Sequence, residues 1–226
     1  MENYANLYRN FYRKEKEMKP YLFLCMSAAV AVLLAACSSA ATPIEDGRPG
    51  SVTPSSTLAT PSLMARPLDA VSSNMEVNDV LTAVASGDPQ QLIKLFGFTK
   101  TACKTVNALG GPPPCRAGEA EGTIVEVLPV LSGEGSYLRK DEISDFPGLN
   151  VVGVYAVYQV SASAYAEEYF PAGDYGIMLV GPENKPGVVL QVKDGRIIRI
   201  EYLFDRASYD TILARDSSGF VLEPIK

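Results

Sequence analysis

The chain has 226 residues, a formal net charge of −6, 47% hydrophobic residues, and neither histidine nor tryptophan. The missing histidine excludes Ser-His-Asp and Cys-His nucleophile systems, zinc sites with histidine ligands and haem ligation by histidine. Any catalysis by this chain would therefore depend on Asp, Glu, Tyr, Lys or Arg side chains.

The N-terminal segment has the order of a secretory signal. Basic residues up to Lys19 precede an uncharged apolar run over residues 21–36, which ends in small residues. A membrane-spanning helix needs about 20 residues, so a cleaved signal is favoured over a retained anchor. Leu34-Ala35-Ala36-Cys37 resembles the lipobox of bacterial lipoproteins. This resemblance implies that residues 1–36 are a lipoprotein signal peptide and that Cys37 is lipidated after cleavage. The sequence leaves open whether Met1 or Met18 is the true start.

Lipidation of Cys37 would anchor the protein to the cell membrane or the outer membrane, on the extracytoplasmic side. Removing residues 1–36 takes away five Lys or Arg and three Asp or Glu, which leaves 15 basic and 23 acidic residues and a net charge of −8. A nucleic-acid partner is not expected, because nucleic-acid binding requires a basic face.

Residues 37–72 are rich in Ser, Thr, Ala and Pro and show no sustained apolar period. Such a segment buries too little apolar surface to order itself, so the sequence predicts a disordered tether. The remaining residues, 73–226, are enough for a single domain with its own core.

Two cysteines remain after the signal and the lipid site are set aside. Cys103 and Cys115 form an even pair in an exported chain, which predicts one disulfide. A redox or metal-binding pair is the alternative, but the spacing is not C-x-x-C and no further ligands lie nearby in the sequence.

Two helices are predicted at the start of the domain. Ser73 and Glu76 have the spacing of a capping box. The apolar residues that follow recur at helical spacing, at Val77, Val80, Leu81 and Val84, and Gly87 ends the pattern. Asp88-Pro89 then predicts the start of a shorter helix that stops at Gly97.

The rest of the domain is predicted to be mostly strand. Apolar runs or alternating patterns predict strands over residues 123–131, 151–162, 174–180, 188–193 and 196–204. Asp194-Gly195 is a two-residue hairpin signal between the last two of these strands. Short helices are predicted over residues 137–144 and 207–214. Helices followed by a long-stranded, mostly antiparallel sheet indicate an α+β fold.

Two local features sharpen this α+β prediction. Ala85-Ser86-Gly87-Asp88 lies at the helix junction, and the second stretch runs from Val192-Lys193-Asp194-Gly195-Arg196-Ile197 through Arg199 and Tyr202 to Asp205. Both resemble the nuclear transport factor 2-like (SnoaL-like) superfamily. The resemblance implies that a curved sheet wraps the N-terminal helices into a cone with a pocket inside, over residues 75–205. A cystatin-like helix-on-sheet domain and an unrelated α+β sandwich are the alternatives.

Tyrosines are the candidate lining of such a pocket. Tyr155, Tyr175 and Tyr202 lie on predicted strands, and tyrosine offers apolar area together with a hydroxyl group. Ordinary packing within the sheet is the alternative explanation for them. The acidic residues Glu119, Glu121 and Glu126 cluster beside the predicted disulfide loop and offer oxygen ligands for calcium. They lack an EF-hand pattern, and solvated surface side chains are the alternative explanation. The sequence assigns no catalytic residue, metal or cofactor.

The expected function is that of a lipid-anchored extracytoplasmic domain that binds a small ligand or an envelope protein partner. One alternative is an isomerase-like or dehydratase-like enzyme with an Asp or Glu base. Another is a structural or assembly component of the cell envelope. A buried carboxylate in a pocket would favour the enzyme, whereas a filled interior with an exposed apolar patch would favour assembly.

Overall fold

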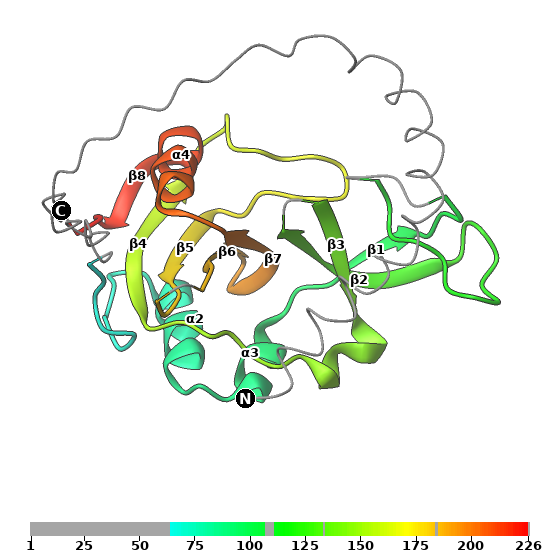
Figure 1. The fold of residues 1–226 in the computed structure, drawn as a ribbon, viewed down its shortest axis with the longest axis horizontal. Helices are drawn as coiled ribbons and strands as arrows, with labels where there is room; N and C mark the ends of the chain where they lie inside the picture. Colours follow the sequence, from blue (N-terminus) through cyan, green and yellow to red (C-terminus); the bar gives the residue numbers. More distant parts are fainter. Residues whose placement is uncertain (1–63, 107–110, 133, 184, 226) are drawn as a thin grey trace, which may run out of the picture. The chain divides into compact units, whose positions relative to one another are not determined.

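The computed structural model describes residues 64–106, 111–132, 134–183 and 185–225. The chain divides into two units, Met1–Thr60 and Pro61–Lys226, and the described residues all belong to the second. Cys37, the predicted signal peptide and most of the predicted tether lie outside the described residues. The described unit has an α+β fold with a mostly antiparallel, open eight-stranded sheet and few helices (Figure 1).

The elements follow the chain in two groups, helices first and then mainly strands. The helices are α2 (Met75–Ala85), α3 (Pro89–Leu95), the 3-10 helix η1 (Lys140–Asp145) and α4 (Arg206–Asp216). The strands are β1 (Thr99–Ala102), β2 (Ile124–Ser132), β3 (Glu134–Arg139), β4 (Gly153–Val160), β5 (Tyr175–Val180), β6 (Gly187–Lys193), β7 (Arg196–Leu203) and β8 (Ser217–Leu222).

The sheet consists of an antiparallel meander, β4 to β7, and a group of three strands, β1, β2 and β3, that joins the meander at β7. Its order is β1-β2-β7-β6-β5-β4-β8, and β3 pairs with β2. The pairs are antiparallel except for β2 and β7, which run parallel. The predicted hairpin between β6 and β7 is confirmed. Its turn residues Asp194 and Gly195 have φ angles of 49° and 67°, which is the left-handed conformation that a two-residue hairpin requires.

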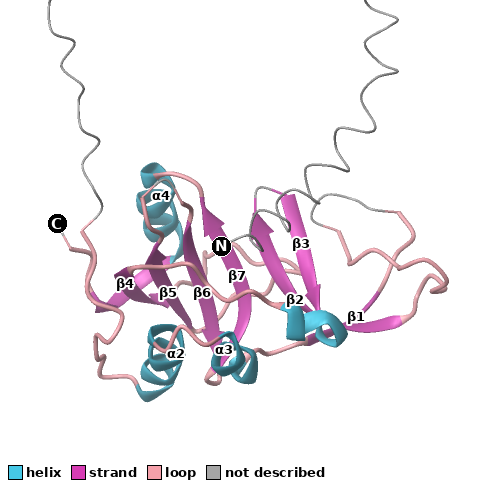
Figure 2. Ribbon diagram, turned by 60° about the horizontal axis from the view of Figure 1, so that its bottom comes forward, coloured by secondary structure: helices cyan, strands magenta, loops and turns pink. Residues whose placement is uncertain are grey.

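Helices cover both faces of the sheet. Figures 1 and 2 show α2 and α3 on one face and α4 on the opposite face. The first face carries the larger apolar core, in which Leu81 of α2 and Leu92 of α3 pack with strand residues such as Leu190. On the second face, Tyr209 of α4 packs with residues such as Met178 and Val189. Successive side chains of one strand point to opposite faces, and the central strands β4, β5, β6 and β7 each supply residues to both cores.

The start of α2 differs from the prediction by one residue. Its N-cap is Asn74, whose side chain accepts a hydrogen bond from the backbone N–H of Val77, and not Ser73. Asn and Ser are similarly good N-caps, so the spacing from Ser73 to Glu76 did not distinguish neighbouring positions. The start of α3 is confirmed, because Asp88 accepts from the N–H of Gln90 and proline occupies the first turn.

Three strands were missed by the sequence analysis, namely β1, β3 and β8. Each is short and only partly buried, so its apolar pattern is weak. The short helix predicted over residues 137–144 was partly wrong. Residues 137–139 end strand β3, and the 3-10 helix η1 begins at Lys140.

The packed unit begins before residue 73. Arg66, which composition placed in the tether, forms a β-bridge with Val154, with N···O distances of 2.8 Å in both directions. Its guanidinium group also donates to the backbone carbonyl oxygen of Glu223. Residues 64–72 therefore belong to the described unit. No helix within the described ranges is long and apolar enough to cross a membrane.

Candidate functional site

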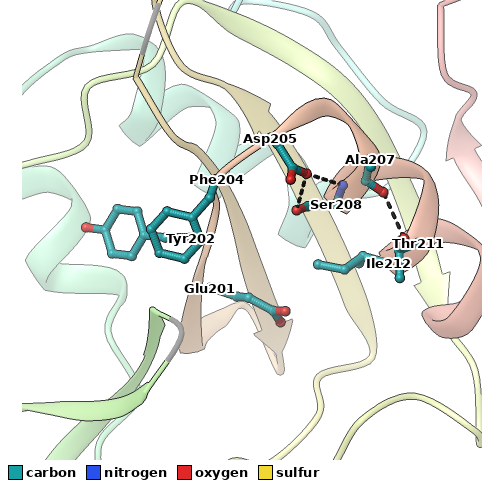
Figure 3. Close-up of a pocket in the computed structure, with 8 residues that line it drawn as sticks. All are labelled: Glu201, Tyr202, Phe204, Asp205, Ala207, Ser208, Thr211 and Ile212. Carbon is teal, nitrogen blue, oxygen red and sulfur yellow. Dashed lines mark hydrogen bonds between the residues drawn. The ribbon is translucent and has the colours of Figure 1, made fainter. Parts of the chain in front are cut away.

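A pocket of about 390 Å³ lies between the end of β7 and the first turns of α4. Figure 3 shows the residues that line it: Glu201, Tyr202, Phe204, Asp205, Ala207, Ser208, Thr211 and Ile212. The pocket is a shallow depression that is largely open to solvent. Its volume lies at the lower end of the range of about 300–1,000 Å³ that small-ligand pockets occupy. The exposed residue Phe204, which is 59% accessible, lines the open side of the pocket.

Glu201 is the charged group at the buried end of this pocket. Its side chain is 12% exposed, and its two carboxylate oxygens lie 3.5 Å from Nη2 of Arg199 and 3.8 Å from Nη2 of Arg215. Both distances exceed the 2.7–2.9 Å of a strong charge-assisted hydrogen bond. Burial raises the pKa of Glu201, while the two arginines act in the opposite direction. The carboxylate is therefore desolvated and retains capacity to accept a further hydrogen bond.

The hydroxyl groups of the pocket also present acceptors. Ser208 donates its hydroxyl hydrogen to Oδ1 of Asp205 at 2.7 Å, and Thr211 donates to the carbonyl oxygen of Ala207 at 2.8 Å (Figure 3). A hydroxyl that has donated its single hydrogen offers only lone pairs to a ligand. Ser208, Thr211 and Glu201 therefore form an acceptor-rich wall. The start of α4 fixes this wall, because Asp205 is the N-cap of the helix.

Arg199 supports the pocket from inside the domain. It is fully buried on β7, and its Nη1 donates to the carbonyl oxygens of Tyr165, Phe170 and Pro171 at 2.9, 3.0 and 3.2 Å. These three carbonyls belong to the segment between β4 and β5, so one guanidinium group holds that segment over the sheet. Its charge also keeps Glu201 beside an opposite charge inside the fold.

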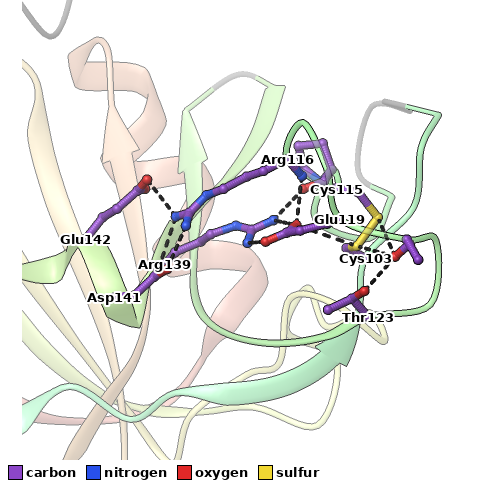
Figure 4. Close-up of polar contacts among 10 residues, drawn as sticks. Cys103, Cys115, Arg116, Glu119, Thr123, Arg139, Asp141 and Glu142 are labelled. Carbon is purple, nitrogen blue, oxygen red and sulfur yellow. Dashed lines mark hydrogen bonds and ion pairs between the residues drawn. A yellow bond between two sulfur atoms is a disulfide. The ribbon is translucent and has the colours of Figure 1, made fainter.

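A second hollow of about 390 Å³ lies beside the disulfide and includes Glu119, Glu126 and Asp141 in its lining. Figure 4 shows the polar contacts around it. Arg139 binds both oxygens of Glu119, at 2.6 and 2.8 Å, and its guanidinium lowers the pKa of Glu119 to about 2. Lys140 lies 2.8 Å from Glu126, and Arg116 lies 2.6 Å from Asp141. These carboxylates already have close cationic partners.

The predicted disulfide between Cys103 and Cys115 is confirmed. The Glu119 carboxylate lies close to both sulfur atoms, within 4.8 Å. A disulfide sulfur is not a thiolate, however, and metal binding requires the thiolate. Glu121 is also paired, at 3.4 Å from Lys104, and it accepts a hydrogen bond from Thr105. The acidic residues around the loop therefore act as partners of basic side chains that fasten the loop to the sheet.

The structure does not bring the three candidate tyrosines together. Tyr155 lies on the α4 face, where its ring makes an edge contact with Tyr209 at 5.2 Å between ring centroids. Tyr175 and Tyr202 pack against the core on the opposite face. Tyr202 also borders the pocket, but Figure 3 shows it extending from β7 in the direction opposite to Glu201.

Sequence reasoning missed Glu201 as a site residue. The signal that would have found it is alternation on β7, because Arg199, Glu201 and Leu203 share one face of a strand whose intervening residues are apolar or aromatic. Two charged residues on the inner face of a strand between apolar neighbours mark a buried ion pair.

No protein-family model matches this chain, and comparison with curated proteins and with solved structures gave no match either.

Proposed function

We propose that the chain is a lipid-anchored extracytoplasmic binding domain whose pocket between β7 and α4 holds a small amphipathic amine. The observation that carries this proposal is the acceptor-rich wall of Glu201, Ser208 and Thr211, in a pocket that the exposed Phe204 also lines. An ammonium group has three N–H donors and no acceptor, so it complements this wall.

The aromatic part of the pocket fits the remainder of such a ligand. Phe204 offers apolar area at the mouth, and the face of an aromatic ring attracts a cation within about 6 Å of its centroid. Anionic ligands are disfavoured because Glu201 and Asp205 both line the pocket. The net charge of −8 expected after signal cleavage also attracts cations over a longer range.

The amine proposal is tested by titrating the exported chain with phenethylamine and following backbone amide shifts by NMR. We expect saturable shifts at Glu201, Phe204 and Ser208, and weaker shifts with 3-phenylpropionate, which has an aromatic ring but a negative charge. Glu201→Gln removes the charged acceptor, and a hydrogen bond to a charged group contributes about 1.5–3 kcal/mol. We therefore expect at least a tenfold loss of phenethylamine affinity.

Asp210→Asn is the matched control. Asp210 is an exposed carboxylate of α4 that does not line the pocket, so its replacement changes the net charge equally. Equal affinity losses for Glu201→Gln and Asp210→Asn would show that the loss comes from the change in net charge, and this result would contradict a specific site at Glu201. Tighter binding of the carboxylate probe than of the amine would contradict the ligand class.

The anchor is the second part of the proposal, and the resemblance of Leu34–Cys37 to a lipobox supports it. The Cys103–Cys115 disulfide agrees with export to an oxidising compartment. Mass spectrometry of the purified protein is expected to show an N-terminal Cys37 carrying lipid. A Cys37→Ser variant that is still lipid-modified and membrane-bound would refute this part without affecting the pocket.

An acid–base enzyme of the isomerase or dehydratase kind is a second candidate, and the raised pKa of Glu201 favours it. Native mass spectrometry of the exported chain distinguishes the two functions. A captured amine that leaves unchanged on denaturation supports binding. A captured molecule that the wild type converts to a product, and that Glu201→Gln does not convert, supports the enzyme.

We also propose that the fold is a variant of the nuclear transport factor 2-like arrangement. The pair α2 and α3 on one sheet face, the Gly87-Asp88 junction and the Asp194-Gly195 hairpin support it. An experimental structure in which the sheet does not curve around α2 and α3 would favour the helix-on-sheet alternative.

A further inference from the structure

Four residues on four adjacent strands form one cross-strand row beneath the segment that Arg199 holds. Tyr158 of β4 pairs with Gly176 of β5, Gly176 pairs with Gln191 of β6, and Gln191 pairs with Arg199 of β7. The side chains of Tyr158, Gln191 and Arg199 are fully buried. Register partners on one face lie within side-chain reach of each other, so these polar groups share a single interior region.

Gly176 lets the tyrosine ring lie across the row. A Cβ atom built at Gly176 would be 2.1 Å from Cζ and 2.5 Å from Oη of Tyr158. The hydroxyl group therefore lies directly above the glycine, one strand away from Gln191. Gln191 pairs with this glycine from the next strand, and neighbouring strands are about 4.8 Å apart, so the hydroxyl group and the Gln191 side chain occupy adjacent positions in the row.

Each of the three polar side chains has one atom without a partner among the described residues: Oη of Tyr158, Nε2 of Gln191 and Nε of Arg199. The other polar atoms of these side chains are engaged. Oε1 of Gln191 accepts from the N–H of Gly173 at 3.1 Å, which fixes the orientation of the amide and directs Nε2 elsewhere. The Nη atoms of Arg199 bind three carbonyl groups and Glu201. Unpaired polar atoms are costly inside a protein, and three in one row indicate a shared partner.

We propose that these three atoms bind one buried water molecule. Water accepts two hydrogen bonds and donates two, so it matches the N–H groups of Gln191 and Arg199 together with the hydroxyl of Tyr158. Buried waters typically make about three hydrogen bonds to otherwise unsatisfied groups. A halide ion is the competing occupant of a site with several donors. It is disfavoured because Asp216 and Glu201 both act electrostatically on Tyr158 and on Arg199, and an added anion would face both carboxylates.

A high-resolution crystal structure of the exported, disulfide-bonded chain tests this site directly. We expect a density peak at about 2.7–3.2 Å from all three atoms. Direct hydrogen bonds among the three side chains, with no peak between them, would overturn the proposal. An anomalous peak at this position after a bromide soak would overturn it as well, because the occupant would then be an anion.

Solution NMR provides a second test with a matched control. A long-lived buried water produces cross-relaxation with nearby protein protons. We therefore expect cross-relaxation between water and the Nε2 protons of Gln191, and between water and the Nε proton of Arg199. Tyr158→Phe removes one of the three partners and is expected to weaken that signal. Tyr155→Phe removes the hydroxyl of another buried tyrosine of β4 on the same face and is expected to leave the signal unchanged. Equal effects of the two variants, or no signal in the wild type, would contradict the site.

Discussion

Substituting Gly176 tests whether the position of the Tyr158 ring depends on the absence of a side chain at residue 176. In Gly176→Ala the new Cβ would lie 2.1 Å from Cζ of Tyr158, whereas ordinary van der Waals contact begins at 3.4 Å. The ring must therefore move by about 1.3 Å (3.4 − 2.1) against the residues that bury it completely. Overpacking of this kind costs about 1–3 kcal/mol. Alanine in place of glycine within a strand returns about 0.5–1 kcal/mol. We expect a net loss of about 1–2 kcal/mol in the free energy of unfolding.

Urea denaturation of a double-mutant cycle measures this contact. Tyr158→Leu removes the ring, so in that background Gly176→Ala should lose its overpacking cost and keep only its strand gain, which gives a coupling energy of about 1–3 kcal/mol. Gly219→Ala in β8 is the control, because its Cβ would meet Oε1 of Gln159 at an unstrained 3.7 Å. We expect that change to stay within about 0.5 kcal/mol. The reasoning is refuted if Gly176→Ala costs the same with and without the ring.

Three further predictions concern the disulfide and the charged residues Glu119 and Arg199. Replacing Cys103 and Cys115 by alanine opens a loop with a sequence separation of 12, and the free energy of unfolding in urea should fall by about 3 kcal/mol. The pKa of Glu119 is depressed in the fold to about 2 from 4.5, so its stabilisation is complete above pH 4.5 and is lost as the pH falls toward 2. The stability difference between wild type and Glu119→Gln should shrink over that interval in thermal melts, and a constant difference would contradict it. Arg199→Leu removes the donor to three carbonyls, and faster hydrogen exchange at the amide of Phe170 should report the release of the segment, whereas unchanged exchange would show that other contacts hold it.

Local signals in the sequence predicted those parts of the fold that local interactions determine. Asp88-Pro89 carries its own capping group, so the start of α3 was read correctly. Asp194-Gly195 is a residue pair that favours the positive φ angles of a tight hairpin turn, and it adopts them here, so the hairpin was also predicted correctly. The disulfide was predicted because only Cys103 and Cys115 remain once Cys25 and Cys37 are assigned to the signal segment and the lipid site. In each case the deciding residues are near neighbours in the chain or belong to a rare residue type.

The pocket depends on contacts that the sequence does not display. Glu201 is held between Arg199 on its own strand and Arg215 on α4, and Arg199 in turn binds carbonyl groups around residue 170. These partners become neighbours only after the strands have paired. The strand β8 was missed for a related reason. Its residues are half-buried against β4, and the two register shifts in that pairing obscure any period of two.

The parallel pairing of β2 with β7 has a consequence for how the chain folds. Val130 of β2 pairs with Ile200 of β7, 70 positions later in the sequence (200 − 130), whereas β5, β6 and β7 join their sequence neighbours through hairpins or short connections. Hairpins form within about 1–10 μs. Closing a long loop is slower, because the chain must lose conformational entropy before the contact at the ends of the loop can stabilise it. The meander should therefore assemble first, and the group of β1, β2 and β3 should dock onto the edge of β7 in the rate-limiting step. Mutations in the β2–β7 contact would then slow folding, and mutations that affect only β8 would mainly accelerate unfolding.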